Sequence, residues 1–264
     1  MFPIGFTMLA LALPFGASPQ VEIVAHRGAS FDAPENTVAA IKLAWEQKAD
    51  ASEFDVYQTK DGQIAVIHDK DTKRTAGLVK VVPETRFEDL RKLDVGTWKN
   101  AKYAGEKIPT LAEMLATVPA GKRVFIEVKC GPEIVPELDR VLKASKLPAA
   151  QTPIISFNAN VIAASKTARP DLAAYWIVSI DKKGQKTAPV EGLIAKARTI
   201  KADGLDLSAS AGLDKPYAEA IRAAGLKLYV WTVNDVAVAK RMIELGVDGI
   251  TTDKPGWLRE RLAK

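Results

Sequence analysis

Residues 24–69, which run from VAHRGASFDAPENT to ASEFDVYQTKDGQIAVIHD, contain the only two histidines of the chain, His26 and His68. Each histidine follows a short apolar, mostly β-branched run, which is typical of a buried strand. Between them, Glu53 and Asp55 lie two residues apart in another strand-like run, so their side chains point to one face. Two buried carboxylates are costly unless a bound cation compensates their charge. The stretch therefore predicts a metal-dependent site with two histidines as acid and base.

A tight hairpin is predicted within this stretch at Asp61 and Gly62, because Asp-Gly suits the two central positions of a type I′ turn. With a two-residue turn, residue 68 would pair with residue 55, provided that no β-bulge shifts the register. The antiparallel strand 63–68 would then place His68 beside Asp55.

Strand-like and helical runs alternate from residue 21 onward, which predicts an α/β protein. Eight strands alternating with helices indicate a (β/α)₈ TIM-type barrel, with the hairpin strand 63–68 as an antiparallel extra. An open, doubly wound sheet is the alternative, but no Gly-x-Gly-x-x-Gly follows any strand. The barrel strands are expected at 21–25, 51–56, 124–129, 153–156, 174–178, 204–207, 226–231 and 248–251. The helices are expected at 36–47, 110–117, 133–145, 158–168, 190–201, 214–224 and 235–245.

Residues 69–107 interrupt this alternation. They hold ten Lys or Arg against seven Asp or Glu, with a short helical run near 86–93. We expect a small insertion over the barrel mouth, after the hairpin strand, so that residues 19–264 form a single domain. A solvated surface loop without a part in binding is the alternative.

Residues 1–18, MFPIGFTMLALALPFGAS, are apolar and uncharged and end in small residues. This pattern is typical of a secretory signal peptide, although such peptides usually carry a Lys or Arg near the start. We therefore predict export, to the periplasm or the cell exterior. If the segment is not a signal peptide, the protein is expected in the cytoplasm.

The composition narrows the class of protein. At 47% hydrophobic and 26% charged residues, the 264-residue chain is typical of a globular protein. The net charge of +5 comes without a basic run interleaved with aromatics, so we expect no nucleic-acid partner. No stretch approaches the roughly 20 apolar residues of a transmembrane segment. The single cysteine, Cys130, excludes an intrachain disulfide and is predicted to be a buried structural thiol.

A third acid, Glu127, lies in the expected strand 124–129 and shares a face with Lys129. If that face is the one on which Glu53 and Asp55 lie, three carboxylates meet with one ammonium group. Oxygen ligands alone favour Mg²⁺ or Ca²⁺ over zinc. The alternative is an outward Glu–Lys pair, which is disfavoured because helices cover the outside of a barrel.

Polar residues beside the first histidine suit phosphate chemistry. Arg27 offers planar, bidentate donors to phosphate oxygens, and Gly28 allows the backbone to approach closely. A strand-end turn with a surface arginine is the alternative. Glu35 could orient His26 or Arg27, or could only place a favourable charge near a helix start.

Two aromatic residues follow strand ends. Trp231 could form the wall of a substrate pocket or could simply be packed, and Phe157 is a weaker case of the same kind. Asp253 follows the last strand, and we expect it to cap the final helix.

Taken together, these residues resemble the motifs of glycerophosphodiester phosphodiesterases, in the same order and over roughly residues 23–256. The motifs are Ala25-His26-Arg27-Gly28, Pro34-Glu35-Asn36-Thr37, Glu53-x-Asp55-Val56, Ile67-His68-Asp69, Ile126-Glu127-Val128-Lys129, Trp231-Thr232-Val233-Asn234 and Thr252-Asp253-Lys254-Pro255. The resemblance implies a phospholipase-C-like barrel that hydrolyses a small-molecule glycerophosphodiester to glycerol 3-phosphate and an alcohol. The apolar segment at the N-terminus is similar to that of exported members.

The resemblance also implies individual roles for eight residues. These are acid–base catalysis by His26 and His68, binding of Ca²⁺ or Mg²⁺ by Glu53, Asp55 and Glu127, phosphate binding by Arg27 and Lys129, and glycerol contact by Trp231. A related lyase that stops at a cyclic phosphate, or that acts on a lysophospholipid, would use the same residues. A non-catalytic phosphate-ester binding protein is disfavoured, because both histidines and all three acids are present. The sequence indicates neither the alcohol nor an oligomeric state.

Overall fold

A computed structural model describes residues 21–181 and 187–263; the predicted signal peptide lies outside these residues. Its sheet closes on itself, because strand β1 (Glu22–Ala25) pairs in parallel with both β2 (Ala51–Gln58) and β9 (Gly249–Thr252). The predicted eight-stranded parallel barrel is confirmed, and the open, doubly wound alternative is excluded. The strands between β2 and β9 are β4 (Arg123–Val128), β5 (Ile154–Ser156), β6 (Ala174–Val178), β7 (Gly204–Ser208) and β8 (Lys227–Trp231).

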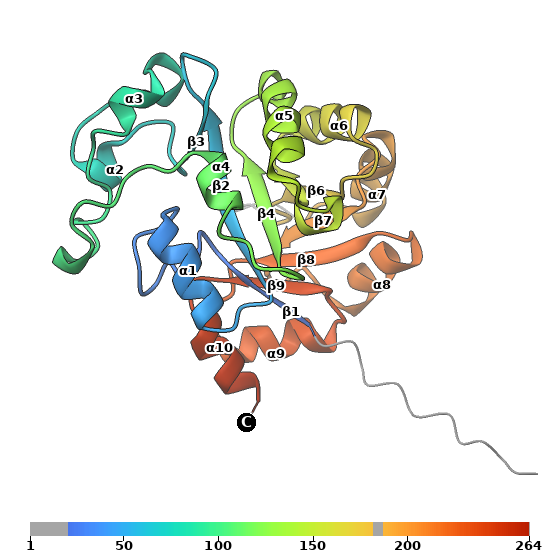
Figure 1. Ribbon diagram of the computed structural model, residues 1–264. Coiled ribbons are helices and arrows are strands. Elements are labelled where there is room, and N and C mark those ends of the chain that lie inside the picture. The colour runs from blue at the N-terminus through green and yellow to red at the C-terminus, as the bar shows by residue number, and fades with distance from the viewer. Residues whose placement is uncertain (1–20, 182–186, 264) are drawn as a thin grey trace, which may run out of the picture.

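Helices surround the barrel (Figure 1), and the main hydrophobic core lies between them and the outward side chains of the strands, such as Phe54 and Ile126. The first helix begins at Val38 because the Thr37 side chain accepts a hydrogen bond from the Ala40 backbone N–H. Among the described residues, no helix has the length and apolar character needed to cross a membrane. The helices are α1 (Val38–Glu46), α4 (Leu111–Leu115), α5 (Val135–Ser145), α6 (Ala159–Ala168), α7 (Val190–Thr199), α8 (Lys215–Ala223), α9 (Val236–Glu244) and α10 (Pro255–Leu262).

The extra strand β3 (Ile64–Val66) pairs antiparallel with β2, as predicted, but the predicted register is wrong by one residue. The Thr59 N–H donates to the Gln63 carbonyl at 2.8 Å, so the loop has three residues, not two. Gly62 adopts a φ of +81° there, which a three-residue hairpin loop requires at its last position. Ile67 therefore lies opposite Asp55, and His68 follows one residue after that pairing.

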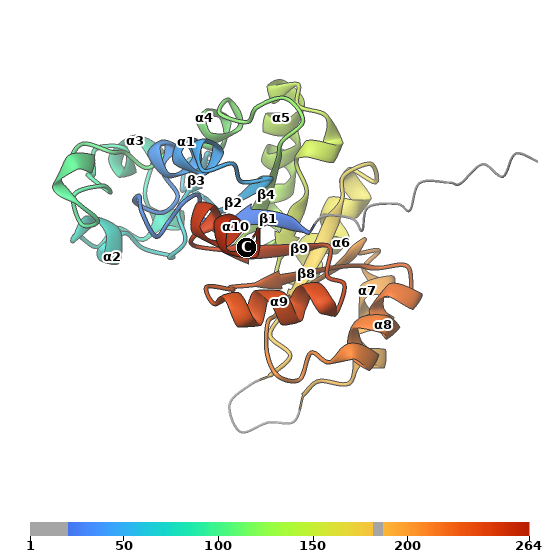
Figure 2. The ribbon, with the colours of Figure 1, turned by 90° about the horizontal axis from the view of Figure 1, so that it is seen from below.

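The insertion folds around a small hydrophobic core of its own, which includes Ile67, Phe87 and Leu90, and packs against β3. Its helices α2 (Lys73–Ala76) and α3 (Phe87–Leu90) lie together on one side of the barrel in both views (Figures 1 and 2). Two side chains join it to the loop after β1, because Lys99 donates to the Ser30 carbonyl at 2.7 Å and Tyr103 to the Asp32 carbonyl at 3.0 Å.

Inside the barrel, side chains from alternate strands stack in layers of four, as the stagger of a TIM barrel dictates. The strand registers define three of these layers. From the amino-terminal end of the strands upward, the layers are Val24, Phe125, Tyr175 and Tyr229; then Glu53, Ile155, Asp206 and Thr251; then His26, Glu127, Ile177 and Trp231. The lowest layer consists of Val24 and three aromatic residues, whereas the upper two contain the acids Glu53, Asp206 and Glu127 and the histidine His26.

Candidate active site

A cavity of about 180 Å³ opens at the carboxyl end of the barrel strands, where TIM barrels carry their active sites. The middle layer forms its floor and the upper layer its wall. Both histidines, Arg27 and Lys129 also line it. Most of the residues predicted from sequence to form one site therefore line one cavity, and the two that do not, Asp55 and Glu35, contact Arg27 in its wall.

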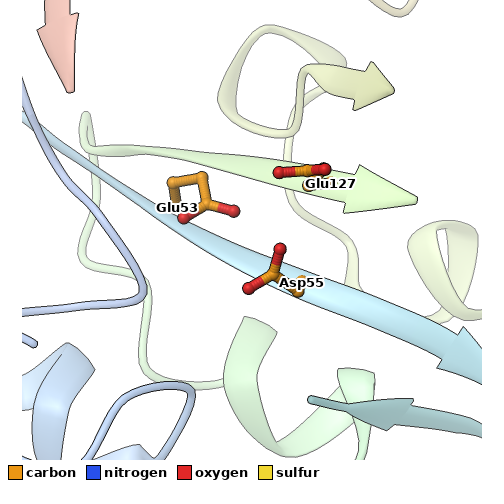
Figure 3. A group of neighbouring side chains, drawn as sticks. All are labelled: Glu53, Asp55 and Glu127. Carbon is orange, nitrogen blue, oxygen red and sulfur yellow. The ribbon is translucent and has the colours of Figure 1, made fainter. Parts of the chain in front are cut away.

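Three carboxyl groups meet beside this cavity. Figure 3 shows Glu53 and Asp55 on β2 beside Glu127 on β4, where Asp55 and Glu127 are register partners. One carboxylate oxygen from each residue lies within 4.8 Å of the others. The exposed fractions of Glu53, Asp55 and Glu127 are 2%, 0% and 7%, so the cluster is removed from water. The predicted convergence of the three acids on one face is present.

The protonation of these acids reflects their crowding. Burial, followed by the charges of Asp55 and Glu127, raises the pKa of Glu53 well above its usual value. Burial and the charge of Asp55 raise the pKa of Glu127 to about 7. Burial also acts to raise the pKa of Asp55, but Arg27 and Lys129 outweigh it and hold that pKa below its usual value. Carboxyl groups this close to one another cannot all ionise unless their negative charge is compensated.

Two carboxylate oxygens of this cluster are free to bind a ligand. Glu53 Oε1 and Asp55 Oδ1 are buried and have no hydrogen-bond partner among the described residues. Buried carboxylate oxygens without partners are costly, and hard divalent cations bind carboxylate oxygens. The three acids therefore fit a divalent cation.

Two basic side chains compensate part of the negative charge. Arg27 Nε lies 3.2 Å from Asp55 Oδ2, and its Nη1 lies 2.9 Å from Glu35. Lys129 Nζ lies 2.7 Å from Glu127 and 3.5 Å from Asp55. Of the two roles considered for Glu35, the contact with Arg27 is the one present. These cationic groups border the cavity next to the acids, where a phosphate would meet them.

Each histidine is held at Nδ1 by a carboxylate. His26 Nδ1 lies 2.6 Å from Asp253 Oδ1, and His68 Nδ1 lies 2.7 Å from Asp69 Oδ1. Such pairs fix the ring and leave Nε2 to exchange protons. Burial lowers the pKa of His68 below its usual value, although the nearby charge of Asp55 raises it. Partial burial acts to raise the pKa of Asp253, but its hydrogen bonds outweigh burial. These bonds, of which that with His26 is the strongest, lower the pKa of Asp253 to about 2.

An aromatic pair also lines the cavity. The rings of Phe157 and Trp231 meet edge to face, with centroids 5.4 Å apart. Trp231 is further fixed because its Nε1–H donates to the Asp206 carbonyl at 3.2 Å. Phe157 is 47% exposed, so the pair runs from the cavity wall to its mouth.

Two positions differ from their sequence expectation. Asp253, expected to cap the final helix, holds His26 instead, and α10 has no side-chain cap. Cys130 is half-buried against the core rather than fully buried, and this burial raises its pKa. Asn36 was given no role in the site, but its side chain donates to Asp55 Oδ2 at 2.8 Å, from a backbone with a φ of +59°.

One acidic residue of the cavity was not predicted from the sequence. Asp206 lies on β7 in the floor of the cavity and is 4% exposed. Its Oδ1 has no hydrogen-bond partner among the described residues. Burial, followed by the charge of Glu127, raises its pKa well above the usual value. A polar residue in an apolar strand run, Gly204-Leu205-Asp206-Leu207, is the pattern that could have identified it.

The sequence profile of the glycerophosphoryl diester phosphodiesterase family matches residues 26–257. The chain belongs to this family. A glycerophosphodiester phosphodiesterase of Caldanaerobacter subterraneus subsp. tengcongensis is 34% identical over 247 residues, which cover 88% of this chain and 94% of that protein. One of Bacillus subtilis is 32% identical over 250 residues, which cover 88% of this chain and 83% of that protein.

Solved structures of this phosphodiesterase family share the fold. A phosphodiesterase of Oleispira antarctica, in complex with the product sn-glycerol-3-phosphate, matches with a TM-score of 0.83 and 28% identity and covers 92% of this chain and 97% of that one. A glycerophosphodiester phosphodiesterase of Agrobacterium tumefaciens matches with a TM-score of 0.78 and 26% identity and covers 91% of this chain and 100% of that one. As a member of the family, the chain is a phosphoric diester hydrolase.

Proposed function

We propose that this enzyme hydrolyses glycerophosphodiesters to glycerol 3-phosphate and an alcohol, with one divalent cation and with His26 and His68 as acid and base. The observation that carries this proposal is the meeting of two carboxylate-held histidines and three acids at one barrel cavity. The names of the relatives, and the glycerol 3-phosphate product bound by the Oleispira enzyme, support the substrate class.

Glu53, Asp55 and Glu127 would hold the cation, either Ca²⁺ or Mg²⁺. A bound cation would offset the negative charge of the phosphodiester and orient it. Arg27 and Lys129 would bind the phosphate oxygens. Their donors are already fixed at the cavity wall by contacts with the acids, so little ordering is needed when the substrate binds.

The histidines would move the protons. One takes a proton from the nucleophile and the other gives one to the leaving alcohol, each at Nε2, because Asp253 and Asp69 occupy Nδ1. The nucleophile is either water or the glycerol 2-hydroxyl, and the second case passes through a cyclic phosphate that water then opens. A lyase that releases this cyclic phosphate is the alternative reaction, and phosphorus NMR of the product distinguishes the two. Trp231 would pack against the glycerol carbons.

The test is a panel of glycerophosphodiesters assayed for glycerol 3-phosphate release. We expect activity that is lost in EDTA and restored by Mg²⁺ or Ca²⁺. His26→Ala and His68→Ala should each lower turnover by roughly 10²-fold or more, with an unchanged circular dichroism spectrum. Near-wild-type turnover in both variants would overturn the mechanism. A wild-type protein that binds glycerophosphocholine but does not turn it over with metal present would indicate a binding protein instead.

A further inference from the structure

The floor of the cavity has one carboxyl group on each side. Glu53 and Asp206 belong to the same layer, from β2 and β7. In the closed strand order, β7 lies across the barrel axis from β2. The two carboxyl groups therefore face the cavity from opposite walls, and only the β2 side carries the rest of the acidic cluster.

Asp206 lies outside the candidate cation site. The ligand atoms of that site come from Glu53, Asp55 and Glu127, all within 4.8 Å of one another, and Asp206 is not among them. Two apolar groups border Asp206 in the cavity wall: Ile177, its register partner on β6, and the ring of Trp231, whose Nε1–H donates to the Asp206 carbonyl. The charge of Glu127 also acts on Asp206, but no ion pair or hydrogen bond joins the two among the described residues.

The chain supplies no hydrogen bond to Asp206 Oδ1 from its described residues, although the side chain is almost fully buried. A buried polar group without a partner is energetically costly. Because Asp206 lines the cavity, a ligand in the cavity can supply the missing partner. The acids that line the cavity disfavour a second phosphate beside Asp206, whereas a small alcohol suits the place, because its hydroxyl group can bond the carboxyl while its carbons pack on Trp231 and Ile177.

We propose that the Asp206 carboxyl group hydrogen-bonds the terminal hydroxyl of the glycerol moiety and makes the enzyme selective for substrates that carry it. This inference rests on the proposed function, which places the phosphate beside Arg27, Lys129 and the acidic cluster. From that position a three-carbon chain extends toward the opposite wall, and its terminal hydroxyl, the one farthest from the phosphate, reaches the side of Asp206.

Two chromogenic substrates test the contact. 2,3-Dihydroxypropyl 4-nitrophenyl phosphate carries the terminal hydroxyl, whereas 2-hydroxypropyl 4-nitrophenyl phosphate lacks only that group and keeps the same nucleophile and leaving group. In Asp206→Ala, kcat/KM for the first should fall by about 10- to 100-fold, the range for a lost hydrogen bond to a charged group. For the second it should change by less than about threefold, because the lost contact was never made. Asp206→Asn should retain part of the selectivity.

Ile155→Val is the matched control, because Ile155 lies in the same layer and has no polar group. It should change kcat/KM for both substrates by the same factor. Calorimetry gives a readout without turnover: Asp206→Ala should weaken binding of glycerol 3-phosphate but not of 2-hydroxypropyl phosphate.

Each other outcome overturns the inference. Equal losses on both substrates in Asp206→Ala would mean a structural role. A large shift in the Mg²⁺ or Ca²⁺ concentration needed for half-maximal activity would assign Asp206 to the cation. If the wild-type protein hydrolyses the 2-hydroxypropyl compound but prefers it over the dihydroxypropyl one, glycerol selectivity fails while phosphodiesterase activity stands. A wild-type protein that hydrolyses neither compound nor any glycerophosphodiester contradicts the proposed function itself.

Discussion

Replacing Glu127 by Gln should stabilise the metal-free protein at pH 8 and change it little at pH 5. Burial and Asp55 raise the pKa of Glu127 from its model-compound value of 4.5 to about 7. The folded state therefore binds this proton more tightly than the unfolded state does. The stability that Glu127 contributes is fully present below pH 4.5 and is lost as the pH rises toward 7. Gln mimics the protonated acid at every pH and avoids that loss.

The shift sets the size of the effect. One pKa unit corresponds to about 1.4 kcal/mol, so the variant should be up to about 3 kcal/mol more stable than the wild type at pH 8. At pH 5 the difference should be within about 1 kcal/mol. For a chain of this length, 3 kcal/mol corresponds to roughly 6–12 °C in the unfolding midpoint. The pKa of about 7 already includes the lowering effect of Lys129, which bonds Glu127, so this gain is net of the lost ionic contact.

Thermal and urea unfolding in EDTA at the two pH values measure the difference. Added Mg²⁺ or Ca²⁺ should then stabilise the wild type, since a ligand of the folded state raises its stability, and should stabilise Glu127→Gln much less. Glu22→Gln is the matched control. Glu22 is half-buried and also has a raised pKa, but it bonds Arg123 and Tyr229 at the other end of the barrel. It should keep the full response to metal.

A Glu127→Gln variant that is less stable than the wild type at pH 8 without metal would refute the reasoning. It would mean that the carboxylate stabilises the fold, through Lys129, more than its burial and its repulsion by Asp55 destabilise it. An equal loss of the metal response in Glu22→Gln would separately refute the location of the cation.

Two further predictions concern His26 and Gly28 in the loop after β1; the first changes Asp253, the residue after β9 that bonds His26. Asp253→Asn should lower kcat at least about 10-fold without changing the metal requirement, because the amide can donate to Nδ1 of His26 and select the wrong ring tautomer; an unchanged pH–rate profile would contradict this. Gly28→Ala should lower the unfolding midpoint more than Gly62→Ala does: both residues have a φ of +81°, but an added Cβ at Gly28 would lie 2.5 Å from the Ala40 backbone, whereas Gly62 has open space. Equal decreases of the unfolding midpoint in the two variants would show that the positive φ, and not the contact with Ala40, determines the loss of stability.

The barrel could be predicted because it depends on local patterns. Apolar runs of four to six residues separated by amphipathic segments identify strands and helices without knowledge of their partners. The hairpin register is also local, yet it was predicted wrongly, because Asp-Gly is compatible with two- and three-residue loops. Lys60 is the residue that the loop has in addition to Asp61 and Gly62. It shifts the pairing so that Ile67 lies opposite Asp55. His68 still reaches the cavity because β3 has ended at Val66.

The residues that hold the site in shape were harder to predict. His26 and Asp253 are 227 residues apart in sequence, and Asn36 and Asp55 are joined across two elements. Polar residues at such distances have no periodicity that links them, so Asp253 was assigned to the nearest helix end and Asn36 was given no role in the site. Only the closure of the sheet between β1 and β9 brings Asp253 beside His26.

Asp206 shows what the layers add to a list of motifs. An acid within a strand could face a covering helix or the barrel interior, and alternation alone allows both. The register around the closed sheet places it in one layer with Glu53, on the wall opposite the acidic cluster. A cavity with charge on one side only could hold a phosphate but could not distinguish what is attached to it. The Asp206 carboxyl group, whose Oδ1 has no hydrogen-bond partner among the described residues, gives the same cavity a second polar contact on the far wall. Reaction and selectivity would then depend on different strands of one barrel, so that Asp206 can vary without loss of the phosphodiesterase chemistry.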